Sequence, residues 1–83
     1  MRYTIRIGQQ LGPSVKSMRK SRGLTQKEAA FKAGVLPKTI SALENGSTTV
    51  TIETLLRLLA IYDYTLELTP KSNDWDIVSQ SIW

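Results

Sequence analysis

Residues 24–46 read Leu-Thr-Gln-Lys-Glu-Ala-Ala-Phe-Lys-Ala-Gly-Val-Leu-Pro-Lys-Thr-Ile-Ser-Ala-Leu-Glu-Asn-Gly, a pattern that predicts two short helices joined by a tight turn. Thr25 suits an N-cap, because its hydroxyl can accept from the unpaired N–H groups of the next turn, and Glu28 can complete a capping box. The first helix is therefore predicted to begin at Gln26. Gly34 permits the left-handed backbone conformation that ends it.

The second helix is predicted to open at Pro37, since proline at the first helical position gives up an N–H that had no partner. Ile40 and Leu43, three residues apart, should face inward, and Asn45-Gly46 should close the helix. The remaining residues of this helix should point outward or sideways: Pro37, Lys38, Thr39, Ser41 and Ala42.

The first helix should present a face of small residues to its neighbour. Ala29, Ala30 and Ala33 allow a second helix to approach closely, while Phe31 and Val35 are expected to supply bulk for the core. Such a helix, followed by a glycine turn and a helix with a polar outer face, is what a major-groove reader needs. A helical hairpin without any ligand is the alternative.

The composition predicts one small domain and argues against an enzyme. The chain has 83 residues, with 41% hydrophobic and 22% charged residues, as in ordinary globular domains. No run approaches the roughly 18 apolar residues of a membrane span, and no signal peptide is recognisable, so a cytoplasmic protein is expected. Cysteine and histidine are absent, and the carboxylates form no paired constellation. We therefore expect no catalytic residue, no metal site and no cofactor.

The charge is divided unevenly along the chain. Residues up to Leu43 include nine Lys and Arg and one acidic residue, a net charge of +8. Residues from Glu44 onward include two basic and six acidic residues, a net charge of −4, so the total is +4. The basic half coincides with the predicted pair of helices. This favours a polyanionic partner such as DNA over a solvated basic face, since Lys and Arg gain affinity by releasing counterions from phosphates.

The N-terminal third contains a strand candidate and a helix. Residues 2–7 alternate polar and apolar side chains, which predicts a short strand, or else an arm that contacts the DNA backbone through Arg2 and Arg6. A helix should start near Gln9 or Gln10 and end at Gly23, with Pro13 tolerated in its early turns. The alternatives are a helix starting at Pro13 or a looser turn before it.

The residues after the two central helices predict another helix and a strand. A polar loop over 47–50 precedes an apolar helix over 52–61, capped by Thr51. Tyr64, Leu66 and Leu68 then alternate with polar residues up to Pro70. Because a lone strand cannot satisfy its backbone, it must pair with the N-terminal strand, with its equivalent in a second chain, or with both. This favours a homodimer.

The chain resembles the phage-repressor (Cro/C1, also called Xre) type of helix-turn-helix domain over roughly residues 11–61. The resemblance is carried by Gly23-Leu-Thr-Gln-Lys-Glu-Ala-Ala, Gly34-Val, Thr39-Ile-Ser-Ala-Leu-Glu-Asn-Gly46 and Thr51-Ile-Glu-Thr-Leu. It implies a mostly α domain of four to five helices, with a short C-terminal strand, and as an option an N-terminal one, forming an intersubunit sheet. It also implies that the protein binds double-stranded DNA at an inverted-repeat operator.

The resemblance also implies which residues contact DNA. Gln26 and Asn45 would bind phosphates, and Lys38, Thr39 and Ser41 would meet bases or neighbouring phosphates. Thr25 and Pro37 complete the predicted set. Pro37 and Ala42 stand where relatives often carry hydrogen-bonding side chains, and they can contact only thymine methyls. Part of the specificity is therefore expected from half-site spacing and DNA deformability.

The last residues are similar to those of the HipB antitoxins, which share an operon with HipA-type kinase toxins. A strand followed by a tail ending in tryptophan carries this narrower resemblance, which implies that Trp75, Ile82 and Trp83 bind the toxin. Alternatively, Asp74 caps a short helix that packs back on the domain.

These observations predict four segments: an arm or strand over 1–8, the helix-turn-helix domain over 9–62, a dimerisation strand over 63–70 and a tail over 71–83. The predicted function is that of a dimeric repressor serving as the antitoxin-type subunit of a HipA-like toxin–antitoxin operon, which represses its own operon. A free-standing phage-type or metabolic repressor is the alternative.

Overall fold

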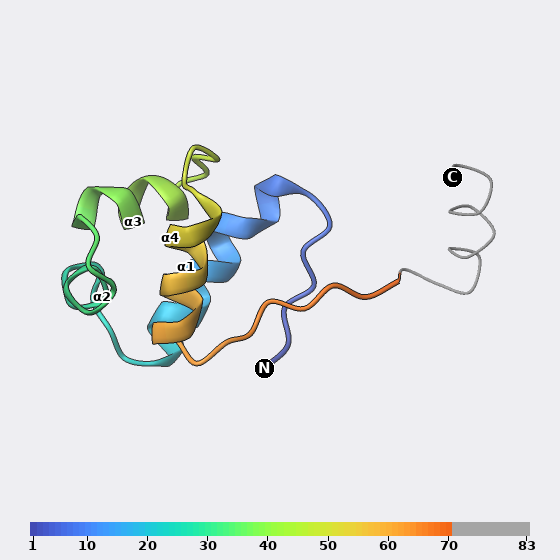
Figure 1. The fold of residues 1–83 in the computed structure, drawn as a ribbon, viewed down its shortest axis with the longest axis horizontal. Helices are drawn as coiled ribbons and strands as arrows, with labels where there is room; N and C mark the ends of the chain where they lie inside the picture. Colours follow the sequence, from blue (N-terminus) through green and yellow to red (C-terminus); the bar gives the residue numbers. More distant parts are fainter. Residues whose placement is uncertain (71–83) are drawn as a thin grey trace.

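The computed structural model describes residues 1–70, in which a small helical domain is flanked by two irregular segments (Figure 1). One short 3₁₀ turn and four α-helices follow one another: η1 (Gly8–Gln10), α1 (Leu11–Ser21), α2 (Gln26–Ala33), α3 (Pro37–Glu44) and α4 (Ile52–Ile61). α2 and α3 are the predicted pair, and α1 and α4 pack behind them. None of the described helices is long and apolar enough to cross a membrane.

The predicted helix caps are confirmed. The Thr25 hydroxyl accepts the N–H of Glu28 at 3.0 Å, and the Glu28 carboxylate accepts the N–H of Thr25 at 2.9 Å. Gly34 ends α2 with a φ of 72°, and Pro37 occupies the first turn of α3. Thr51 caps α4 by accepting the N–H of Thr54. Local chemistry therefore sets the ends of these helices.

The start of α1 differs slightly from the prediction. Gln9 and Gln10 belong to the 3₁₀ turn, and the α-helix begins at Leu11. The side-chain oxygen of Gln10 accepts the backbone N–H groups of both residues that precede Gly8, which stabilises the turn. Pro13 is the third helical residue, and the first four N–H groups of a helix have no intrahelical partner, so proline loses no hydrogen bond there.

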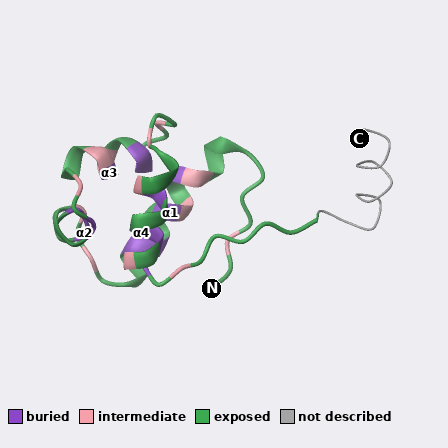
Figure 2. Ribbon diagram, viewed as in Figure 1, coloured by how far each residue is buried: buried purple, intermediate pink, exposed green. Residues whose placement is uncertain are grey.

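The core lies where α1, α3 and α4 face one another and the alanine face of α2 closes it (Figure 2). Its largest fully buried side chains are Val15, Ile40, Leu43, Leu58 and Tyr62. α1 approaches α3 closely at Gly12, where a Cβ would stand 2.6 Å from the carbonyl oxygen of Leu43. Only glycine fits this contact without displacing a backbone.

The prediction that Phe31 contributes to the core is wrong. Ala29, Ala30 and Ala33 are buried as predicted, and Val35 packs partly against the core, but Phe31 is 77% exposed. The helix period explains this difference, because at about 100° per residue Phe31 lies on the face of α2 opposite Ala29 and Ala33. Side chains of α3 and α4 fill the core in its place.

The two predicted strands are not formed within residues 1–70, as expected of a strand that lacks a partner to pair with. The segments nevertheless meet, because the rings of Tyr3 and Tyr64 pack edge to face with 5.6 Å between their centroids. The Tyr3 hydroxyl is 2.7 Å from the Ser17 hydroxyl, and Arg22 lies over the Tyr64 ring. An intersubunit sheet therefore stays a prediction.

Candidate nucleic-acid interface

The outer face of α3 holds most of the residues predicted to contact DNA. Ile40 and Leu43 are buried, which turns the opposite side of this short helix outward. Pro37, Lys38 and Ala42 are exposed, and Thr39 and Ser41 are half-buried at the edges of the face. Asn45 follows the helix, and its amide donates to the Ser41 hydroxyl at 3.4 Å. The structure thus brings these predicted residues together on one surface.

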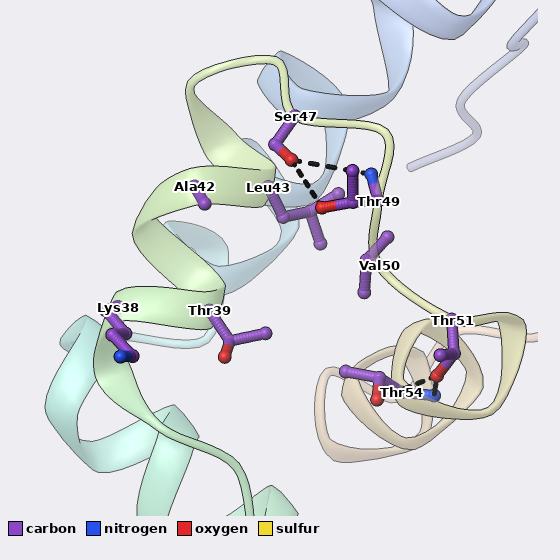
Figure 3. A pocket seen from close by; sticks show the side chains of 9 residues that line it. All are labelled: Lys38, Thr39, Ala42, Leu43, Ser47, Thr49, Val50, Thr51 and Thr54. Carbon is purple, nitrogen blue, oxygen red and sulfur yellow. Dashed lines mark hydrogen bonds between the residues drawn. The ribbon is translucent and has the colours of Figure 1, made fainter.

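A groove beside α3 adds residues that the sequence analysis treated only as a polar loop (Figure 3). It lies between α3, the α3–α4 loop and the first turn of α4. Five of its residues carry hydroxyl groups: Thr39, Ser47, Thr49, Thr51 and Thr54. The Ser47 and Thr49 hydroxyls are 2.9 Å apart, and Thr51 donates to Thr54 at 3.0 Å. The signal in the sequence was the run of hydroxyl residues directly before an N-cap.

The groove has the chemistry of a surface that follows a phosphate backbone. Hydroxyls can donate to phosphate oxygens, and the N–H groups at the start of α4 point out of the helix. Lys38 forms the positively charged border of the groove. Of the ion pairs in the described part of the chain, none includes Lys38, so its ammonium group is available to an anionic ligand.

Gln26 is held in place by a buried ion pair that the sequence analysis did not predict. The Arg19 guanidinium donates to both oxygens of Glu44, at 2.7 and 3.0 Å, and also to the Leu24 carbonyl at 2.7 Å. The Gln26 amide donates to Glu44 at 3.0 Å. Arg19 and Glu44 are each only 7% exposed. This network joins α1, α2 and α3 and orients the Gln26 side chain at the first turn of α2.

The network keeps Glu44 ionised. Burial alone would raise the pKa of its carboxyl, but hydrogen bonds from Arg19 and Gln26 outweigh burial and leave the pKa below its usual value. The hydrogen bond with Glu44 in turn raises the pKa of Arg19 despite its burial. Two opposite charges are therefore retained beneath the surface, where each satisfies the other.

Thr25 also lies at the first turn of α2, where the capping box already uses one of its lone pairs. Its hydroxyl proton can still donate to a phosphate oxygen, since a threonine hydroxyl is both a donor and an acceptor. The predicted partner-binding residues Trp75, Ile82 and Trp83 lie outside the described residues. Of the predicted dimerisation residues, Tyr64 is partly buried against the domain, whereas Leu66 and Leu68 are exposed.

Comparison with known proteins assigns the chain to a family. The helix-turn-helix family model matches residues 15–68, which include α2 and α3. A comparison with curated proteins finds no match. Among solved structures, a chain of a HipA–HipB–O2–O3 complex is 30% identical, with 86% of this chain and 100% of that chain covered and a TM-score of 0.77.

Two further structures with DNA are similar. A chain of a HipB–O4 20mer complex has the same identity of 30%, the same coverage of 86% and 100%, and a TM-score of 0.77. SinR, the master regulator for biofilm formation in complex with DNA, is 32% identical over 66% of this chain and 89% of its own, with a TM-score of 0.63. The chain belongs to the phage-repressor (Cro/C1) type of helix-turn-helix family and is a DNA-binding regulator similar to HipB and SinR.

Proposed function

We propose that this protein is a dimeric repressor that reads an inverted repeat through α3 and serves as the antitoxin-type subunit of a HipA-like kinase toxin–antitoxin operon. The observation that carries the DNA-binding part is the outer face of α3, bordered by Lys38 and adjoining a Gln26 side chain that Glu44 holds. The likeness to a HipB chain over 100% of that chain's length supports the antitoxin part.

The residues divide into two groups by chemistry. Gln26, Lys38 and Asn45 present donors at the edges of the surface and bind phosphates, which positions α3 on the duplex. Thr39 and Ser41, at the edges of the outer face of α3, meet bases or neighbouring phosphates, and Pro37 and Ala42 offer only apolar contacts to thymine methyl groups. A DNA-binding protein with so few bidentate contacts to bases takes part of its sequence specificity from the shape of the DNA.

The segment over residues 63–70 forms the dimer interface. Tyr64 is fixed to the domain through Tyr3 and Arg22, while Leu66 and Leu68 are 50% and 90% exposed. Pairing this segment with its equivalent in a second copy would satisfy its backbone and cover both leucines. A two-fold axis then places the two α3 helices about 34 Å apart, one turn of DNA.

The tail supplies the contact with the toxin. Trp75, Ile82 and Trp83 give it apolar character, and tryptophan is the residue that most often dominates protein interfaces. The likeness to a chain found together with HipA in one complex supports this assignment. An operator that overlaps the operon's own promoter would make the dimer an autorepressor.

A free-standing repressor is the second candidate, and the likeness to SinR favours it. Co-purification from the native cell separates the two candidates. The full chain and a version ending at Pro70 are compared, with bound proteins identified by mass. A kinase-like protein that binds the full chain and is lost with the truncation supports the antitoxin. A free repressor would bring no partner in either form.

Selection of binding sites from random duplexes tests the DNA-binding part. The dimer should enrich inverted repeats with half-sites one helical turn apart. A monomer at micromolar concentration, or a protein without preference for inverted repeats, contradicts the proposal.

A further inference from the structure

The outer face of α2 carries an aromatic side chain that the DNA-reading surface does not use. Phe31 is 77% exposed, and with Lys27, Glu28 and Lys32 it lines a shallow, mostly apolar depression. We call these four residues the Phe31 surface. Gln26 and Phe31 are five residues apart on one helix, which separates them by about 140° around its axis. DNA held at Gln26 and α3 therefore leaves Phe31 uncovered.

The Phe31 surface carries a net positive charge, from the two lysines Lys27 and Lys32 and the single carboxylate of Glu28. The Glu28 carboxylate accepts from the N–H of Thr25, and hydrogen bonds with Thr25 lower its pKa. Neither Lys27 nor Lys32 forms an ion pair with an acidic side chain in residues 1–70. The surface thus combines an exposed aromatic ring with a net positive charge. Its complement is an aromatic residue flanked by carboxylates.

The chain itself contains that complement. Asp74-Trp75-Asp76 places an indole between two carboxylates, in a segment that lies outside the described residues. We propose that the Phe31 surface of one copy binds Asp74-Trp75-Asp76 of a second copy, an inference that rests on the proposed dimer. Trp75 packs on Phe31, and the two aspartates pair with Lys27 and Lys32.

The course of the chain decides between its own tail and that of another copy. Residues 64–70 lead away from α4 on the side opposite α2 (Figure 1). Trp75 follows Pro70 by five residues, which span at most about 18 Å. Five residues are too few to span back over the seven before them, so this length does not bring Trp75 to α2 of its own chain. If each of two copies binds the tail of the other, the two contacts are related by a two-fold axis and form a closed dimer. A toxin would compete for the same tail.

Tryptophan fluorescence tests this contact in the full chain, because both tryptophans, Trp75 and Trp83, lie beyond residue 70. A Trp83→Phe chain reports on Trp75 alone. We expect its emission to be shifted to shorter wavelength than that of a synthetic peptide of residues 71–83 that carries the same Trp83→Phe change. Phe31→Ser should abolish the shift and leave the helix content by circular dichroism unchanged, since the Phe31 ring lies outside the domain core. Ile52→Ser, at another exposed apolar position, on α4, should leave the shift intact.

Mixing identifies which copy provides the tail. One chain carries Phe31→Ser and Trp83→Phe, so that it keeps Trp75 but lacks the ring. The other carries Trp75→Phe and Trp83→Phe, so that it keeps Phe31 but is without tryptophan. Mixing the two should restore the shifted emission, because Trp75 of the first binds Phe31 of the second. A shift that Phe31→Ser leaves unchanged, or that mixing fails to restore, overturns the inference.

A charge exchange tests the ion pairs. Lys27→Glu with Lys32→Glu should abolish the shift, and adding Asp74→Lys with Asp76→Lys to the same chain should restore it. Failure of the fourfold variant to recover any shift overturns the assigned pairing. The oligomeric state and operator binding are measured on the same samples. A monomeric wild type refutes the proposed dimer, whereas a dimer that binds operator without a Phe31-dependent shift refutes this inference alone.

Discussion

Replacing Glu44 with glutamine should destabilise the domain far more than the small change in side-chain shape suggests. Glu44→Gln keeps the shape of the side chain but removes the charge that faces Arg19, which is only 7% exposed. Removing one partner of a buried ion pair costs about 3–5 kcal/mol, because the other charge stays buried without compensation. Glutamine can still accept one hydrogen bond, so we expect the lower value, about 3 kcal/mol.

This loss is large for a chain of 83 residues. At roughly 0.05–0.15 kcal/mol per residue, its total free energy of unfolding is about 4–12 kcal/mol. With a urea dependence of about 1.2 kcal/mol per molar, Glu44→Gln should lower the unfolding midpoint by about 2.5 M. Urea titration followed by circular dichroism at neutral pH measures this shift.

A matched control comes from the exposed pair on α4, in which Glu53 and Arg57 are 3.4 Å apart. Glu53→Gln makes the same chemical change at the surface and should cost less than about 0.5 kcal/mol. Replacing both buried partners, with Arg19→Met and Glu44→Leu, should recover most of the stability, since no charge is left unpaired. If Glu44→Gln unfolds at the same urea concentration as Glu53→Gln, the buried pair does not have the role derived for it.

The same carboxylate predicts how stability depends on pH. The pKa of Glu44 is lowered in the folded protein, so this contribution is present above the pKa of the unfolded chain and is lost as the pH falls through the folded value. The wild type should therefore lose stability below about pH 4, and Glu44→Gln should lose less over the same range. Urea midpoints measured between neutral and acidic pH check the difference. Equal slopes for both proteins would contradict the assignment.

Three further substitutions give distinct expectations. Gly12→Ala should lower the free energy of unfolding by about 1–3 kcal/mol, although alanine has the better helix propensity, because the new methyl group would lie 2.6 Å from the Leu43 carbonyl oxygen. Thermal unfolding measures this loss, and an unchanged midpoint would refute the close contact. Tyr62→Phe should leave the free energy of unfolding unchanged or raise it by about 1 kcal/mol, since the buried hydroxyl has no partner among the described residues and burial raises the pKa of Tyr62 to about 12. A clear loss of stability in calorimetry would show that the hydroxyl does have a hydrogen-bond partner. Lys38→Ala should weaken operator binding and reduce the slope of log K against log salt concentration by about 1. Anisotropy titrations at several salt concentrations measure this slope, and an unchanged slope would exclude a phosphate contact.

The positions of the helices could be predicted because their signals are local. Thr25, Gly34 and Thr51 act within one turn of the backbone, so that their chemistry determines where α2 and α4 begin and where α2 ends. The inward positions of α3 followed from the helical period. The outward side of α3, which we propose reads DNA, could be predicted for the same reason, as it lies opposite the buried Ile40 and Leu43.

Contacts between distant residues could not be predicted in this way. The helix period places Phe31 opposite Ala29 and Ala33, but only the packing of α2 against α3 and α4 decides which of these two faces is buried. The hydroxyl groove depends on how the α3–α4 loop folds over α3. No local pattern reports either arrangement.

The sequence by itself determined the bounds of α2, the starts of α3 and α4, the turn between α2 and α3 and the basic half of the chain, because each depends on neighbouring residues or on composition. Only the tertiary structure decided that Arg19 and Glu44, 25 residues apart, form the buried pair that holds Gln26, and that α1 touches α3 at Gly12. Helix packing brings these groups together. These groups therefore interact only once the helices have packed against one another.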